Sequence, residues 1–131
     1  MERYFAFSSG GAYHFQGRGD WKIRVDERGT LTVEHNVFGA VTGYGPYQLL
    51  PAESRSLWEC IEAAGFDRRS SSRRRGNPDE ALLAFALFSG EKLHSAQLWA
   101  GEAFDDHSIT SLINWITELI GKYTGKEPVL R

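Results

Sequence analysis

The chain has 131 residues and a formal net charge of −2 at pH 7, with 41% hydrophobic and 24% charged residues. A chain of this length is one domain's worth, and it can bury enough surface for a core without disulfides or metals. The single cysteine, Cys60, excludes an intramolecular disulfide and any multi-cysteine zinc or iron–sulfur site. The near-neutral charge also removes global basicity as an argument for nucleic-acid binding. We therefore expect one globular domain over residues 1–131, without cofactor or metal.

The N-terminus has no apolar stretch long enough for a secretory signal, and no run of about 18 apolar residues occurs anywhere. These observations favour a soluble, cytoplasmic protein that does not associate with membranes.

The first half of the chain shows the pattern of antiparallel strands. Residues 3–9 form a short, aromatic-rich segment that ends at two glycines, and Tyr13–Gln16 is either a further short strand or a loop. Asp20–Asp26 and Thr30–Val37 alternate apolar and polar residues, which predicts a hairpin with one buried face. Residues 38–50 mix glycine, proline and aromatic residues, and we interpret them as a long loop or an irregular edge strand.

A helix is predicted to begin at Pro51, because proline suits the first helical position, and to end at Gly65. Its apolar stripe contains Leu57, Trp58, Ile61 and Ala64. Phe66 is expected to anchor the chain in the core just beyond the helix. Residues 67–80 have no apolar periodicity, and we expect a polar, arginine-rich, mobile loop.

A second hairpin follows. Ala81–Phe88 is nearly continuously apolar, which favours a buried central strand, although the pattern alone is also compatible with a helix. Ser89-Gly90 has the composition of a two-residue turn, and Glu91–Trp99 is predicted to return as the partner strand.

The last helix is predicted to begin at Asp105 as its N-cap, with Phe104 and Ile109 placed as a hydrophobic staple. It should end at Gly121 or Gly125. A wide apolar stripe on this helix comprises Ile109, Leu112, Ile113, Ile116, Leu119, Ile120 and Tyr123.

These elements predict a single-domain α+β fold with a C-terminal tail at 125–131. The expected order is strand, optional short strand, two strands, helix, two strands, helix. The short turns imply an antiparallel sheet of four to five strands, with both helices packed on one face.

Catalytic signatures are weak. His35 and His94 lie on predicted strands, and an active site built on them would require the two rings to meet across the sheet. His35 is otherwise expected to be a partly buried sheet residue, and Cys60 a small hydrophobic residue within a helix. No histidine pair has metal-ligand spacing, so we expect no metal site, and no catalytic constellation is recognisable, so we do not expect an enzyme.

The sharpest charge feature is a cluster of arginines around three serines. The candidate anion-binding residues are Arg68, Arg69, Arg73, Arg74 and Arg75. They could dock phosphate, RNA or an acidic partner. The alternative is a solvated loop whose charges keep the chain soluble.

Aromatic residues on glycine-rich segments are the other candidate. The candidate partner-binding residues are Phe38, Tyr44, Tyr47, Tyr13 and Phe15. Exposed rings on such segments suit contact with a protein or peptide, whereas rings that fold back would only cap the edge of the core. The edge between His35 and Tyr47 could also pair across two chains, so monomer and homodimer both remain open.

Several short motifs recur in a group of small bacterial α+β domains. They are Ser9-Gly10-Gly11, Leu50-Pro51-Ala52-Glu53, Ala64-Gly65-Phe66, Pro78-Asp79 and Leu112-Ile113-Asn114-Trp115. With these motifs the chain resembles the emfourin-like group, which includes a proteinaceous inhibitor of thermolysin-like metalloproteases. The resemblance implies the sheet-and-helix fold and a role in binding rather than catalysis.

The sequence therefore predicts a small protein-binding module, with a protease-inhibitor-like role as its narrower form. The alternative is an anion or RNA docking domain that uses the loop from Arg68 to Arg75.

Overall fold

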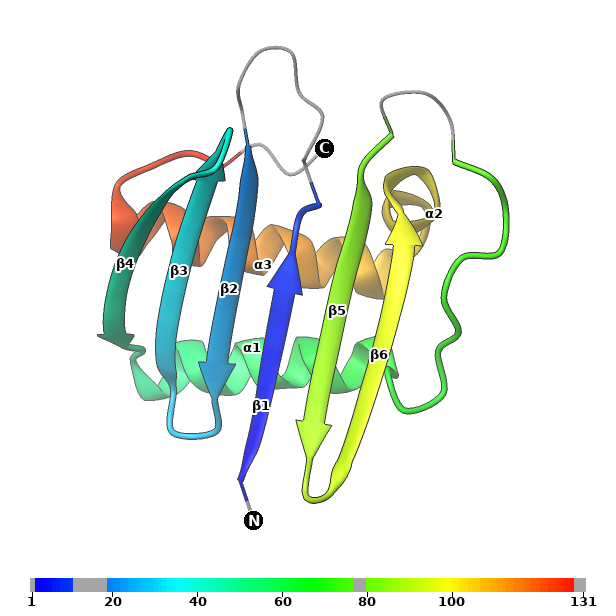
Figure 1. Cartoon of the computed structure of the whole chain (residues 1–131). Coiled ribbons are helices and arrows are strands. Elements are labelled where there is room, and N and C mark those ends of the chain that lie inside the picture. Colours follow the sequence, from blue (N-terminus) through cyan, green and yellow to red (C-terminus); the bar gives the residue numbers. More distant parts are fainter. Residues whose placement is uncertain (1, 11–18, 77–79, 129–131) are drawn as a thin grey trace.

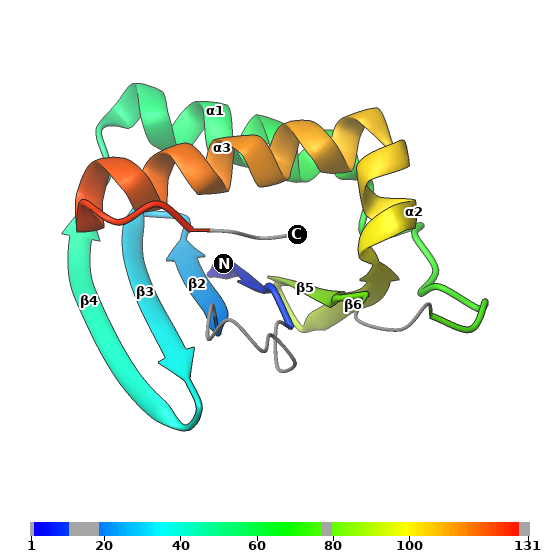
Figure 2. The ribbon, with the colours of Figure 1, turned by 90° about the horizontal axis from the view of Figure 1, so that it is seen from above.

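The computed structural model describes residues 2–10, 19–76 and 80–128, and in these residues one antiparallel sheet is covered on one face by helices (Figures 1 and 2). The strands are β1 (Arg3–Ser8), β2 (Asp20–Asp26), β3 (Thr30–Val37), β4 (Ala40–Gln48), β5 (Leu82–Ser89) and β6 (Lys92–Trp99). The helices are α1 (Pro51–Ala64), α2 (Ala100–Asp105) and α3 (His107–Thr124). The predicted α+β class with an antiparallel sheet is confirmed.

The strands lie in the order β4-β3-β2-β1-β5-β6, so β1 is central and β4 and β6 are the outermost strands. The predicted hairpin of β2 and β3 is present, and Gly29 in its turn has a φ of 82°. Successive side chains in a strand point to opposite faces. Trp21, Ile23 and Val25 accordingly lie buried on the helix-facing side, while Lys22 and Arg24 are exposed on the open side.

The core lies between the sheet and the two long helices. Phe85 on β5 is at the centre of an aromatic group, with ring centroids 5.2 Å from both Phe7 and Phe66. Phe66 is buried directly after the helix end, as predicted, and Phe5 also packs against it. The apolar stripes predicted for α1 and α3 are buried in this layer, apart from the partly buried Tyr123.

The ends of α1 agree with the sequence prediction. Pro51 is the first helical residue, and the backbone N–H of Leu50 donates to the carboxylate of Glu53 at 2.9 Å. At the other end Gly65 adopts the left-handed conformation, with a φ of 66°. Gly125 has the same role at the end of α3, with a φ of 74°.

The N-cap predicted for the last helix is wrong by one residue. Asp106, not Asp105, accepts hydrogen bonds from the backbone N–H groups of Ser108 (3.0 Å) and Ile109 (3.1 Å). Two adjacent aspartates are equally good caps by composition. Asp105 instead completes the short helix α2, which the sequence did not indicate.

Three further predictions need correction. The sheet has six strands among the described residues, not four to five. The segment after residue 38 forms β4, which confirms the alternative of an irregular edge strand, whereas Tyr13–Gln16 lies outside the described part. The second hairpin turns at Gly90 and Glu91, since Ser89 already pairs with Lys92. β5 lies inside the sheet but is buried on its helix-facing side alone, because nothing among the described residues covers the other face.

None of the described helices is both long and apolar enough to cross a membrane.

Candidate functional site

The two outermost strands of the sheet differ in what lies beside them. β4 pairs with β3 on one side, and Figure 1 shows no described element along its other side. Seven of its nine residues are exposed, and its sequence contains no charged side chain. Unpaired N–H and C=O groups on a sheet edge form a template for an added strand. We call the stretch from Phe38 to Tyr44 the β4 edge.

Hairpin geometry fixes which backbone groups of the β4 edge are free. Phe38 and Gly39 have φ values of 51° and 86°, which is the signature of a two-residue type I′ turn. Val37 and Ala40 close this turn. In an antiparallel ladder alternate residues bond to a given neighbour, so Ala40, Thr42 and Tyr44 face β3. Val41 and Gly43 therefore point their N–H and C=O groups away from the sheet.

Phe38 is the most exposed large hydrophobic residue of the described chain, at 82%. It stands at the tip of the hairpin, which reaches away from the helical layer in Figure 2. The side chain of Asn36 accepts from the N–H of Gly39 at 2.9 Å and so holds the turn. A left-handed φ is costly for a bulky residue, and asparagine or glycine is usual at this position. Phe38 thus contributes strain and an exposed ring, but no burial.

The other predicted aromatic residues lie elsewhere. Tyr44 and Tyr47 point to the helix-facing side. The ring centroid of Tyr44 lies 6.3 Å from that of Trp21, and the ring centroid of Tyr47 lies 5.3 Å from that of Tyr123. Both are half-buried against the core, so for them the alternative of capping the core edge applies. Tyr13 and Phe15 lie outside the described residues.

The distal half of β4 is irregular. The register with β3 shifts between Leu31 and Val33, so that Gly45 and Pro46 form a bulge. Proline has no N–H to donate, and bulges bend an edge strand away from further pairing. The open part of the strand therefore ends near Tyr44.

The opposite edge is covered over the C-terminal half of β6. The N–H of Ser72 donates to the carbonyl of Gln97 on β6 at 2.8 Å, and the N–H of Gln97 donates to Oγ of Ser71 at 2.9 Å. The N–H of Trp99 donates to Oγ of Ser72 at 3.1 Å, and its ring Nε1–H donates to the carbonyl of Arg74 at 3.0 Å. These side-chain and backbone bonds attach residues 71–74 of the predicted loop to β6.

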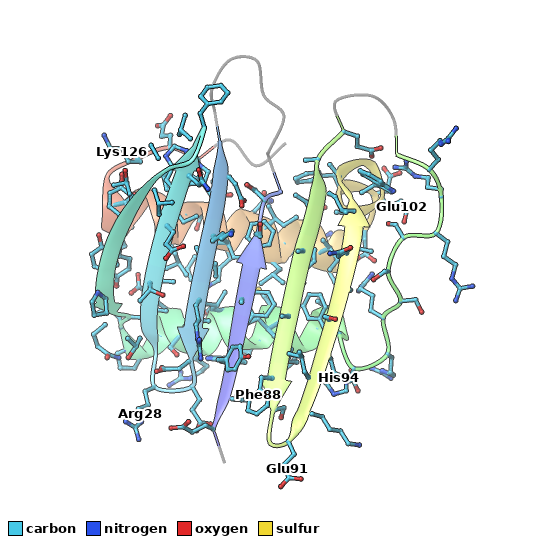
Figure 3. The ribbon with its side chains drawn as sticks, in the orientation of Figure 1. Arg28, Phe88, Glu91, His94, Glu102 and Lys126 are labelled. Atoms are coloured by element: carbon cyan, nitrogen blue, oxygen red, sulfur yellow. The ribbon has the colours of Figure 1, made fainter. Side chains whose placement is uncertain are left out.

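Gly76 is the reason that this segment can pass over Trp99. A Cβ at Gly76 would lie 2.5 Å from the indole ring, closer than real contacts allow. Figure 3 shows Glu102 beside this segment, where its carboxylate accepts from Oγ of Ser72 at 2.7 Å. Ser71, Ser72 and Trp99 were not predicted as a group, since bonds between side chains and a distant backbone leave no periodic pattern.

The five arginines of the cluster have different surroundings. Arg69 binds the carboxylate of Asp106 at 3.0 Å and the carbonyl of Ala64 at 2.9 Å. Arg74 makes two hydrogen bonds to Glu80 and an ion pair with Glu102 at 2.9 Å. The hydrogen bond to Glu80 raises the pKa of the Arg74 guanidinium.

Arg68, Arg73 and Arg75 remain exposed. The side chain of Arg68 is 85% exposed and lies 3.8 Å from its neighbour Asp67. Among the residues that the structure describes, no ion pair is found for Arg73 or Arg75. The predicted anion-binding cluster is therefore divided into two arginines that pair with carboxylates of other segments and three exposed ones that, among the described residues, do not.

We expect the double change Ser71→Ala and Ser72→Ala to lower the free energy of unfolding by about 1–2 kcal/mol, because two edge N–H groups lose their acceptors. Amide exchange at Gln97 and Trp99 should accelerate at the same time. Ser70→Ala is the matched control, since Ser70 is exposed and should leave both quantities unchanged. Equal exchange in the double variant and the control would show that β6 is not covered in this way.

The histidine pair does not assemble. β3 and β6 are separated by β2, β1 and β5, so His35 and His94 lie four strand spacings apart, or about 19 Å. His35 instead stacks on Trp21, with ring centroids 3.9 Å apart, as expected for a partly buried sheet histidine. Figure 3 shows His94 on β6, at the other side of the sheet. The hypothesis of an active site at these two rings is thereby contradicted.

The serine and glycine residues at the end of β1 donate hydrogen bonds to a carboxylate of the chain itself. Oδ1 of Asp20 accepts from Oγ of Ser8, Oγ of Ser9 and the N–H of Gly10, each at 3.0 Å. These donors therefore hold the ends of β1 and β2 together. Within the described residues no group of three or more His, Cys, Asp and Glu side chains could hold a metal ion. Burial raises the pKa of the Cys60 thiol, which disfavours the nucleophilic thiolate.

A scan against models of known protein families gives no match, and a search of curated proteins gives no significant match.

Proposed function

We propose that the chain is a small protein-binding module that contacts its partner through the β4 edge. The exposed ring of Phe38 at a φ of 51° is the observation that carries the proposal. A residue that strains the backbone without being buried adds nothing to the stability of its own fold, and strain of this kind is concentrated at functional positions. Large aromatic residues are also the side chains that most often dominate the energy of protein interfaces.

The surroundings of Phe38 support the same proposal. Val41, two residues beyond the turn, is 58% exposed, and the free N–H and C=O groups of the strand lie beside it. An extended partner segment could add to the sheet here, with main-chain hydrogen bonds giving affinity and side chains giving specificity. On the other edge, residues 71–74 already occupy the outward-facing groups of Gln97 and the N–H of Trp99 on β6.

We expect Phe38→Asn to abolish partner binding and at the same time to raise the free energy of unfolding by about 0.5–1 kcal/mol, because asparagine tolerates the left-handed conformation. The measurement is quantitative recovery of one identified partner from native lysate, together with urea denaturation. Leu93→Asn is the matched control, since Leu93 is 59% exposed on β6, far from the β4 edge. Undiminished recovery by Phe38→Asn would contradict the site.

The resemblance to the emfourin-like group suggests a narrower form of the proposal, in which the partner is a protease. The purified chain would then lower the activity of a thermolysin-like metalloprotease, and Phe38→Asn would restore that activity. Full protease activity in an excess of the wild-type chain would remove the narrower form and leave the binding module in place.

The exposure of Arg68, Arg73 and Arg75 supports anion or RNA docking as a second candidate function. With three phosphate contacts, the logarithm of the affinity for single-stranded RNA should fall with the logarithm of salt concentration at a slope of about −2. Replacing the three arginines with glutamine should abolish this binding. Equal loss in a control that changes Arg28, Arg55 and Lys126 to glutamine would indicate a nonspecific effect of charge.

A further inference from the structure

The open stretch of β4 has none of the features that normally prevent strands from pairing across molecules. Natural edge strands are protected by charged side chains, prolines or bulges. In β4 the proline and the bulge lie beyond residue 44, and no residue of the strand is charged. Val41 and Gly43 consequently present four free backbone groups to the outside, within a stretch that carries no electrostatic barrier.

Gly43 has no explanation within a single chain. Its φ is outside the left-handed region, and a Cβ built on it would meet nothing within 4 Å. A glycine in the interior of a strand costs roughly 0.5–1 kcal/mol relative to alanine. Such a glycine often marks the point where another chain approaches closely. Gly43 lies on the open face of the sheet, opposite Glu34 on β3.

We infer that the occupant of this stretch is a second copy of the chain, whose β4 pairs with it in the antiparallel sense. This inference rests on the proposed function and names the partner of the β4 edge. The free N–H and C=O groups of Val41 bond to those of Gly43 in the second copy. The groups of Gly43 bond in the same way to Val41 of the second copy, so the contact contains four N–H···O=C hydrogen bonds. Thr42 faces its own equivalent across the two-fold axis, and the two six-stranded sheets become continuous.

The side chains on the open face favour a second copy over an unrelated peptide. In this register the exposed Val41 of each chain lies opposite Gly43 of the other. Because glycine has no side chain, the valine has room to pack there. The match needs a large residue and a glycine spaced equally on either side of the axis, and Val41 and Gly43 have that spacing about Thr42. In Figure 2 no helix lies beside the outer side of β4, so the approach of another sheet is unobstructed.

Size-exclusion chromatography with light scattering over a wide concentration range tests the inference. The wild-type chain is expected to reach twice its monomer mass of 14.7 kDa as concentration rises. Thr42→Glu places two carboxylates opposite each other at the axis and should raise the dissociation constant at least about tenfold. Thr42→Val is the matched uncharged control and should remain dimeric. An equimolar mixture of Thr42→Glu and Thr42→Lys should recover the dimer.

Three outcomes overturn the inference: a wild-type chain that is monomeric at every concentration, a dimer that Thr42→Glu leaves intact, or a mixture that does not re-associate. Circular dichroism checks that each variant is folded. Thr42 is exposed, so the fold should tolerate the change. A monomer whose capture of another protein depends on Phe38 refutes the dimer and retains the proposed function. A dimer sensitive to Thr42→Glu, without such capture, supports the inference and refutes binding to other proteins.

Discussion

Replacing Phe85 with alanine is expected to lower the free energy of unfolding by about 3–5 kcal/mol, the largest effect of any change considered for this fold. Phe85 is 2% exposed, and its ring contacts those of Phe5, Phe7 and Phe66. Truncation removes the ring from an interior that packs at crystal-like density, and the neighbouring rings can fill the cavity only in part. Urea denaturation measures the loss directly.

Phe88→Ala is the matched control for that experiment. Phe88 lies on the same strand but points to the open face, where it stacks on Tyr4 at 5.2 Å and remains partly exposed. Its truncation should cost clearly less than that of Phe85. Equal losses at the two positions would mean that the open face is as buried as the helix-facing side, and the two-layer arrangement would be wrong.

Changing Asp106 to alanine should lower the free energy of unfolding by about 1–2 kcal/mol at neutral pH, because α3 loses its N-cap and Arg69 loses its partner. The hydrogen bond from Ser108, with those from Ile109 and Arg69, lowers the pKa of Asp106 to about 2 from an ordinary value of 3.8. The carboxylate therefore stabilises the fold above about pH 4, and the contribution is lost as the pH falls through about 2.

Urea denaturation at neutral pH and near pH 2 checks both parts of this prediction. The difference between the wild-type chain and Asp106→Ala should shrink as the pH falls, since the wild-type carboxyl then becomes protonated. Asp105→Ala is the matched control, because Asp105 is exposed and caps no helix, and it should change the free energy by less than about 0.5 kcal/mol. A larger effect at Asp105 than at Asp106 would show that Asp105 is the N-cap, as the sequence suggested.

Local patterns predict most of the helix-facing layer. The alternation in β2 and β3 and the stripes of α1 and α3 each name the residues that the structure buries. These signals depend on residues close together in the sequence. The helix ends at Pro51, Gly65 and Gly125 are predictable because proline and glycine have characteristic backbone conformations. The N-cap of α3 was misplaced because Asp105 and Asp106 are chemically equivalent until the backbone is known.

The edges of the sheet could not be predicted in the same way. β4 has no clean alternation, because the bulge at Gly45 and Pro46 changes the register, and its pairing depends on β3 rather than on its own composition. The attachment of Ser71 and Ser72 to β6 joins positions 26 and 27 residues apart through single hydrogen bonds. Sequence reasoning identified the aromatic segment and the arginine cluster, but not which members of each remain exposed.

The chain itself closes the outer side of β6 at Gln97 and Trp99, while the β4 edge is open to a partner. Hydrogen exchange of individual backbone amides, measured at low and high protein concentration, distinguishes the two edges. We expect the amides of Gln97 and Trp99 to exchange slowly at both concentrations, and those of Val41 and Gly43 to exchange rapidly when dilute and more slowly when concentrated. Rapid exchange at Gln97 and Trp99, or exchange at Val41 and Gly43 that does not change with concentration, would rule out this difference between the edges.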